Sequence, residues 1–201
     1  MMKTFSDSFV SVAANTAGYA TGVTLGAWTL SNTLLTGATG VGQLFNILNN
    51  SAVNHSAKTA VIVGLDAAGL PQTETMALPA ASVSSTSAKW YSSVTSVTPS
   101  ASITPDSMNL GWTASAVSRW SEPLNGAGTS PFNVGFCVTV DSGAPNYTAQ
   151  HMYGTAAVFN HATVVTKTAS FEGAYTSPVS RVRVANTVAG GFTLTLIASH
   201  R

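Results

Sequence analysis

Charged side chains are scarce in this sequence. Asp, Glu, Lys and Arg make up 7% of the 201 residues, and the formal net charge is +1, whereas about 25% is usual for a soluble domain. So small a charge offers no basic surface to nucleic acid or anionic lipid, and we expect neither as a partner. A polar surface of Ser, Thr, Asn and Gln carries little repulsion and favours association. The composition therefore predicts a subunit of a larger assembly; a monomer from a Ser/Thr-rich genome is the alternative.

Cysteine and long apolar runs are also nearly absent. The single Cys137 excludes an internal disulfide and a cysteine-based zinc site, and its place between apolar residues indicates a packing role. No apolar run approaches the ~20 residues of a membrane helix. The first ten residues are too polar for a signal peptide, so we expect a protein made and kept in a cytoplasm until assembly.

Motifs of catalysis are missing. The sequence contains no G-x-S-x-G elbow, no phosphate-binding glycine loop and no H-E-x-x-H. His151 and His161 lie ten residues apart, but two histidines without a third ligand make a poor metal site. We therefore predict no catalytic residues, no cofactor, no metal and no small-molecule substrate, that is, a protein that is not an enzyme.

What the sequence does contain is strand periodicity, clearest over residues 131–153. Five apolar residues occupy every second position: Phe132, Val134, Phe136, Val138 and Val140. This is the period of a strand with one buried face. Residues 141–145 carry turn chemistry and residues 147–153 alternate again, which predicts a β-hairpin.

Similar short strands recur along the chain, and no segment has a helical period. Residues 58–65 and 72–78 predict a hairpin, residues 89–97 a single strand, and residues 178–184 with 191–197 a final hairpin. The fold class predicted is all-β, an antiparallel β-sandwich or jelly-roll-like fold, in one unit or in two tandem halves. We place an N-terminal arm at 1–20, one sandwich half at 21–112 and the second at 113–201.

Five residues are candidates for assembly contacts. Large apolar side chains in the small, polar N-terminal segment suggest an arm that docks on its own domain or on a neighbour, with a first strand as the alternative. Two arginines, two residues apart on one strand face, suggest a solvated face or a subunit contact. These candidates are Phe5, Phe9, Val10, Arg181 and Arg183.

The four tryptophans allow a second kind of site. Exposed on one face, they could stack on sugar rings; buried, they would belong to a sandwich core. They are Trp28, Trp90, Trp112 and Trp120.

From residue 57 onward the chain resembles structural proteins of tailed bacteriophages. The resemblance rests first on GLDAAGLPQTETMALP followed by SAKWYSSVTSVTPSASI, a G-x-D-x-x-G-x-x-x-T-E-T hairpin before an aromatic strand and V-T-S-V. In the second half it rests on SRW, SPFNVGFCVTV, NYTAQHMY, FNH, TSPVSRVRV and GGFTLTLIAS. It implies a β-rich virion subunit encoded among head and head–tail genes, and it brings no catalytic residues.

Three functions remain as hypotheses. The first is a capsid decoration (cement) protein on the outer surface of the virion head, an oligomer, expected as a trimer, bound to the major capsid protein. The second is a head–tail adaptor or a tail or fibre component. The third is a carbohydrate-binding module for host attachment, which would use the tryptophans.

Overall fold

The computed structural model describes residues 2–24, 27–35, 37–124, 132–154, 157–175 and 179–200. In this part of the chain the fold is all-β and contains no helix, and every strand pairing is antiparallel. The prediction of an antiparallel β-sandwich fold is confirmed. The strands are β1 (Met2–Ser11), β2 (Asn15–Val23), β3 (Val41–Asn49), β4 (Thr59–Leu65), β5 (Pro71–Ala77), β6 (Ser84–Tyr91), β7 (Ser93–Pro99), β8 (Met108–Ser118), β9 (Phe132–Gly143), β10 (Tyr147–Tyr153), β11 (Ala157–Asn160), β12 (Phe171–Tyr175), β13 (Arg181–Asn186) and β14 (Gly190–His200).

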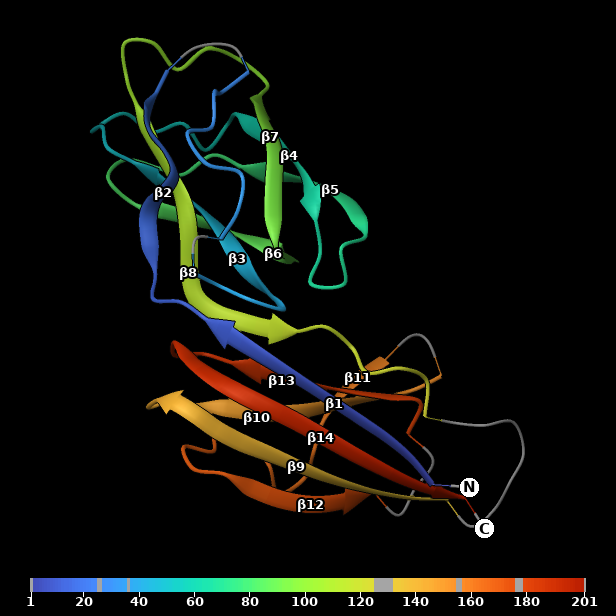
Figure 1. Cartoon of the computed structure of the whole chain (residues 1–201). Helices are drawn as coiled ribbons and strands as arrows, with labels where there is room; N and C mark the ends of the chain where they lie inside the picture. Colours follow the sequence, from blue (N-terminus) through green and yellow to red (C-terminus); the bar gives the residue numbers. More distant parts are fainter. Residues whose placement is uncertain are drawn as a thin grey trace.

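Three sheets build the molecule. The first has the order β1-β14-β9-β12, and the third has the order β5-β4-β7. The second runs β11-β10-β13-β8-β3-β6, with β2 paired to β8. Figure 1 shows that this middle sheet extends through both lobes, so each lobe is closed by a different small sheet.

The C-terminal lobe buries a valine-rich core between the first sheet and one half of the middle sheet. Inward-facing residues of β9 and β14 meet those of β10 and β13 there. The buried members are Phe9, Val41, Ala116, Leu124, Val134, Phe136, Val138, Tyr147, Ala149, Val164, Tyr175, Val179, Val182, Val184, Phe192, Leu194 and Leu196. Burying each large side chain is worth about 1.5–3 kcal/mol, so this alternation selects the inward face of each strand.

The N-terminal lobe has a second core, in which most valines are replaced by the longer side chains of Ile, Leu and Met. It lies between the β5-β4-β7 sheet and the other half of the middle sheet. The buried members are Tyr19, Ala20, Trp28, Leu35, Phe45, Ile47, Ala60, Ile62, Met76, Leu78, Tyr91, Val94, Val97, Ile103, Met108, Leu110 and Trp112.

Two strands belong to both lobes. On β3, Val41 lies in the C-terminal core, whereas Phe45 lies in the N-terminal core. On β8, Ala116 lies in the C-terminal core and Leu110 in the N-terminal core. The boundary expected between residues 112 and 113 therefore falls inside β8, a continuous strand that bends from one lobe into the other (Figure 1).

Two hairpins expected from the sequence are wrong. β9 pairs with β14 and β12, whereas β10 pairs with β11 and β13, so residues 131–153 do not form a hairpin. The expected turn at Asp141–Gly143 instead continues β9, and Gly143 pairs with Gly190. β13 and β14 likewise belong to different sheets. Short connections that cross from one sheet to the other replace both turns, because a sandwich core accepts alternating strands from either sheet.

Two further expectations differ from the structure. Residues 89–97 are not one strand, because β6 ends at Tyr91 and β7 begins at Ser93 in another sheet. Residues 2–11 of the expected docking arm are β1, an edge strand that pairs with β14 along its length, so the alternative of a first strand holds for them. Phe5 and Phe9 pack against the C-terminal core, and Phe9 stacks on Phe192 with ring centroids 5.2 Å apart. The β4–β5 hairpin is confirmed.

Candidate functional site

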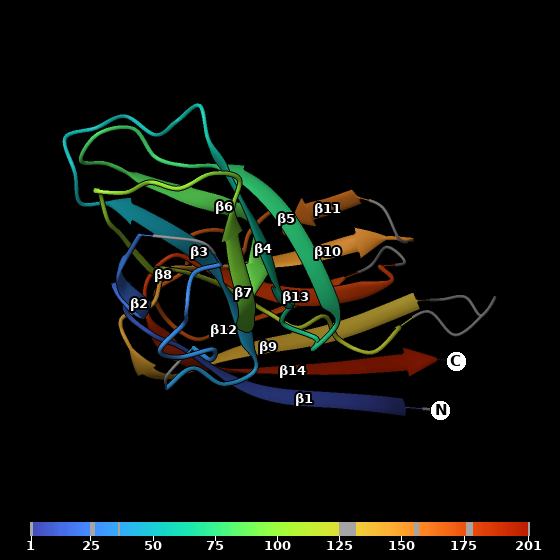
Figure 2. The same cartoon turned by 90° about the horizontal axis from the view of Figure 1, so that it is seen from above.

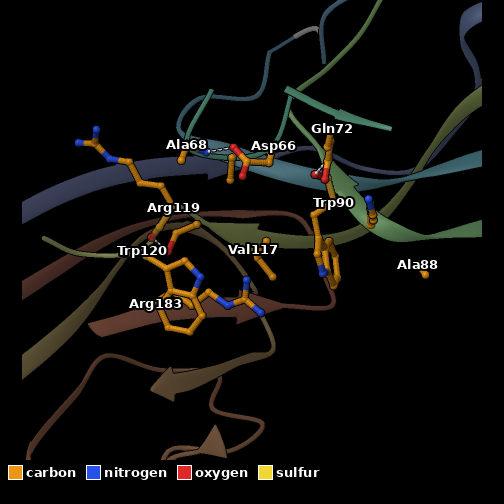
Figure 3. Close-up of a pocket in the computed structure, with 12 residues that line it drawn as sticks. Asp66, Ala68, Gln72, Ala88, Trp90, Val117, Arg119, Trp120 and Arg183 are labelled. Carbon is orange, nitrogen blue, oxygen red and sulfur yellow. Dashed lines mark hydrogen bonds between the residues drawn. The ribbon is translucent and has the colours of Figure 1, made fainter. Parts of the chain in front are cut away.

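A groove lies where the β4–β5 hairpin meets the middle sheet. Two cavities, of about 230 Å³ and about 200 Å³, share three lining residues, Ala68, Arg119 and Trp120. The first is drawn in Figure 3. It is lined by Asp66, Ala67, Ala68, Gln72, Ala88, Lys89, Trp90, Val117, Ser118, Arg119, Trp120 and Arg183, and the second adds Phe5, Ser121, Glu122, Pro123 and Arg181.

The β4–β5 turn forms one wall of the groove. Asp66 Oδ1 accepts hydrogen bonds from the backbone N–H groups of Ala68 and Leu70, at 2.8 and 2.9 Å. Gly69 has φ +79°, a conformation that favours glycine. The aspartate and glycine of the G-x-D-x-x-G pattern thus shape this turn.

The same hairpin holds the β6 segment that carries Trp90. Glu74 accepts hydrogen bonds from the backbone N–H groups of Ala88 and Lys89, at 2.7 and 3.0 Å. Gln72 Nε2 donates to the carbonyl oxygen of Trp90, at 2.6 Å. The polar residues of the T-E-T stretch therefore fix the backbone beside the groove.

Arg183 lies on the opposite wall, on β13. Its guanidinium is 4.4 Å from the centre of the Trp120 ring, a cation–π contact, and its Nε donates to Gln150 Oε1 at 2.9 Å. Burial lowers the pKa of Arg183 to about 10, so the group stays charged at neutral pH. Its polar side-chain partner in the described part of the chain is a neutral amide, not a carboxylate.

Ser121 places Trp120 over Arg183. Its backbone N–H donates to the carbonyl oxygen of Val182 at 2.9 Å, and its Oγ accepts from the N–H of Val182 at 3.1 Å. These two bonds fasten the chain after β8 alongside β13, which holds the indole above the neighbouring guanidinium.

The remaining charges along the groove are partly neutralised. Arg119 donates from Nε and Nη2 to both carboxylate oxygens of Asp7, at 2.7 and 3.0 Å. This hydrogen bonding raises the pKa of Arg119. Lys89 Nζ donates to the backbone oxygen of Thr73 at 2.6 Å. Arg183 differs from Arg119 because its side-chain contacts among the described residues are with a neutral amide and an aromatic ring, not with a carboxylate.

The structure separates the four tryptophans into two pairs. Trp28 and Trp112 are buried in the N-terminal core. Trp90 and Trp120 are half-buried and line the groove. A row of four stacking rings is therefore absent, but two rings are available at one place.

The five candidate assembly residues do not form one surface. Phe5 and Arg181 line the second cavity and Arg183 the first. Phe9 is buried in the C-terminal core. Val10 is 39% exposed and pairs with Thr39 across an isolated bridge. Sequence spacing indicated correctly that the two arginines share a face, but no local signal placed Trp90 and Trp120 beside them.

A separate apolar patch lies on the outer edge of the middle sheet. Every residue of β11 is exposed, and none of the described strands pairs with its outer edge. Three side chains form this edge patch: Tyr153, Val158 and Phe159, 45%, 45% and 46% exposed. The rings of Tyr153 and Phe159 lie on one face of this edge, with centroids 5.5 Å apart, whereas Val158, opposite Met152, lies on the other face.

The histidines behind the edge patch pack against aromatic rings. His151 and His161 lie 5.1 and 4.9 Å from the ring of Tyr175, measured between centroids. Burial, and then the proximity of His161, lowers the pKa of His151. Among the described residues, no group of three or more His, Cys, Asp or Glu side chains could hold a metal ion.

Comparisons with known proteins add little to this picture. No protein-family model matches the sequence, and no curated protein matches it. A solved structure, the allantoicase (yir029w) of Saccharomyces cerevisiae, is similar at 10% identity with a TM-score of 0.27, over 99% of this chain and 100% of that one. Over the described residues, no helix is long and apolar enough to cross a membrane.

One expectation is corrected by that match. The neighbour is an enzyme by its printed name, which contradicts the prediction that this chain is not an enzyme, and we withdraw that prediction. A TM-score of 0.27 carries no argument about fold or activity, so the neighbour assigns no reaction to this chain.

Proposed function

We propose that this chain is a structural subunit of a tailed-bacteriophage virion. In this proposal it decorates the outer surface of the head as an oligomer, a trimer, that binds the major capsid protein. The motifs of the β4–β5 hairpin and of the strands after it motivate the proposal, and their residues act in building the fold: Asp66 shapes a turn and Glu74 holds the neighbouring strand.

The edge patch of β10 and β11 is the observation that carries the proposal. Among the described residues β11 pairs only with β10, so its outer edge, with Val158, Phe159 and the neighbouring Tyr153 exposed, is a template for pairing with another chain. Soluble monomers usually protect such edges with charge, and β11 has no charged residue. Aromatic side chains are enriched at protein interfaces, which suits a contact between copies.

The low charge of the chain supports the same conclusion. Only 7% of its residues are charged, so neighbouring copies meet with little repulsion. A shell protein present in many copies needs this property because each copy lies close to others of the same charge.

The first test compares two surface variants by light scattering after size-exclusion chromatography. We expect the wild-type protein to be a trimer and Phe159→Asp to be a monomer, since a carboxylate in the edge patch would be buried without a partner. Leu70→Asp is the matched control: Leu70 is 62% exposed in the β4–β5 turn, and this variant should remain a trimer. A wild-type protein that is monomeric at high concentration contradicts the oligomeric part of the proposal.

The second test counts and locates the protein on purified particles. A decoration protein is present in a copy number comparable with that of the major capsid protein, and its deletion weakens the shell. A dozen copies or fewer on a quantitative gel, with density at the unique vertex in electron micrographs, would assign the chain to the head–tail region instead. Absence from the particle would overturn the virion role.

A further inference from the structure

We propose that the groove between the β4–β5 hairpin and the middle sheet binds an acidic saccharide, a pyranose ring that carries a carboxylate. In this site the guanidinium of Arg183 binds the carboxylate, and the indole of Trp90 packs against the sugar ring. The site is independent of the proposed virion role, because a single chain contains the whole groove.

The distribution of positive charge is the first argument. The chain has eight Lys and Arg residues, and four of them line the two cavities: Lys89, Arg119, Arg181 and Arg183. Two of its seven Asp and Glu residues, Asp66 and Glu122, do so as well. In a protein so poor in charge, this concentration of cations favours an anionic ligand.

The state of Arg183 is the second argument. Its guanidinium is partly removed from water, and among the described residues it faces an amide oxygen and an aromatic ring but no carboxylate. A desolvated cation of this kind gains from an added anion, and a guanidinium can bind a carboxylate through two parallel hydrogen bonds. The ring of Trp120 and the amide of Gln150 hold the guanidinium in place, so little side-chain entropy remains to be lost on binding.

The third argument is Trp90. It lines the cavity half-buried, and no ring or cation of the described residues stacks on it. In Figure 3 its indole and the guanidinium of Arg183 extend towards one another, with Val117 near the space between them. An apolar face beside a cation matches a pyranose with a carboxylate, which presents C–H groups on one face and charge at its edge.

The hairpin wall supplies hydrogen-bond acceptors for sugar hydroxyls. Asp66 uses Oδ1 for the two bonds of its turn, and among the described residues its Oδ2 has no partner. Gln72 donates from Nε2, and its Oε1 has no partner in the same part of the chain. Both residues line the first cavity.

These acceptors decide between a saccharide and a nucleotide. A nucleotide carries more negative charge per ring than a uronate, so Asp66 and Glu122 would repel it more strongly, whereas the hydroxyl groups of a sugar donate readily to carboxylates. The two cavities share three lining residues, and their volumes of about 230 and 200 Å³ suit one or two sugar rings rather than a long polymer segment.

Calorimetric titration tests the proposal with three probes: tetragalacturonate, neutral cellotetraose and adenosine monophosphate. We expect saturable binding of one tetragalacturonate per chain and at least tenfold weaker binding of the other two. Arg183→Gln should weaken tetragalacturonate binding at least tenfold, and Arg183→Lys should restore part of it. Lys167→Gln is the matched control: it removes one positive charge outside the groove, where Lys167 stacks on Phe171, and should leave binding unchanged.

A nuclear magnetic resonance titration of the unmodified protein gives a second readout that does not depend on a variant folding. The indole N–H signals of Trp90 and Trp120 should shift on adding tetragalacturonate, while those of the buried Trp28 and Trp112 should not. The proposal is overturned if tetragalacturonate does not bind, if cellotetraose binds equally well, or if the nucleotide binds more tightly. It is equally overturned if Arg183→Gln binds as the wild type does, or if the Trp90 signal stays in place.

Discussion

The two lobes differ in the side chains that fill their cores and in the regularity of their strand pairings. In the C-terminal lobe, β9 and β14 pair over eleven residue pairs with one irregularity, and valines form much of the core. In the N-terminal lobe, the pairings of β2 with β8, β3 with β6 and β3 with β8 all contain register shifts, and Ile, Leu and Met replace most of the valines of the core. Valine packs well on a regular pleated surface, whereas longer and more flexible side chains such as Met fill the uneven gaps that an irregular sheet leaves.

The largest difference in stability between variants of the two lobes should come from replacing one glycine in each lobe by alanine. In the N-terminal lobe, a Cβ at Gly111 would lie 1.8 Å from the carbonyl oxygen of Asn15, so Gly111→Ala pushes β2 away from β8. We expect a loss of more than about 4 kcal/mol of unfolding free energy. In the C-terminal lobe, Gly135→Ala meets its nearest atom at 3.9 Å and should change stability by less than about 1 kcal/mol. Denaturant unfolding followed by circular dichroism measures both, and equal effects would contradict the comparison.

Next in size are truncations of one fully buried ring in each core. Phe45→Ala and Phe192→Ala should each cost about 3–5 kcal/mol, because both rings have no exposed surface. Phe192 stacks between Phe9 and Tyr147, so its loss also frees β1. Differential scanning calorimetry then shows whether the lobes unfold together: because β3 and β8 cross both cores, we expect one transition. Two separate transitions in either variant would show that the shared strands do not couple the lobes.

Two ion pairs give the third contrast. In the N-terminal lobe His55 Nε2 lies 3.0 Å from Asp106 Oδ2 with the imidazole buried, whereas half of the Arg119 side chain is exposed beside Asp7. Asp106→Ala leaves a buried ring nitrogen without a partner and should cost about 1–3 kcal/mol. Asp7→Ala should cost less than about 1 kcal/mol, and the cost should shrink as salt is added. Urea titrations at two salt concentrations distinguish them; a larger cost for Asp7→Ala would reverse the expected order.

The smallest contrast concerns two buried tyrosine hydroxyls. Tyr147 Oη donates to the carbonyl oxygen of Ala169 at 2.8 Å, whereas Tyr19 Oη is buried and has no hydrogen-bond partner among the described residues. Tyr147→Phe should therefore destabilise the protein by about 1 kcal/mol, and Tyr19→Phe should be neutral or stabilising. Thermal unfolding of the two variants side by side is the measurement. A clear loss of stability for Tyr19→Phe would indicate a partner for that hydroxyl.

Local sequence signals predict some of the strand pairings of this fold and not others. The β4–β5 hairpin was predictable because Asp66 and Gly69 carry a local turn signal between two alternating runs. The partners of β9 and β13 were not, because alternation selects the inward face of a strand but not the sheet to which it belongs. The long-range pairing of β9 with β14 decides that question, and no local pattern encodes it.

In the groove, too, the sequence predicts which residues of one strand share a face but not which residues of other segments join them. The spacing of Arg181 and Arg183 indicates a shared face of one strand. Their neighbour Trp120 comes close only through the bonds of Ser121 to Val182, between segments 61 residues apart. Trp90 enters from yet another strand, so the site exists only once the middle sheet has formed.

The antiparallel pairing of β1 with β14 has a mechanical consequence. Met2 lies opposite Ser199, so the two ends of the described chain emerge side by side at one corner (Figure 1, Figure 2). A force that pulls these ends apart acts across the ladder and breaks its backbone bonds one after another, as a zipper opens. Peeling at low force would release β1 first and uncover the edge of β14, whereas handles at Met2 of β1 and at Gly190, the far end of β14, would load the whole ladder in shear.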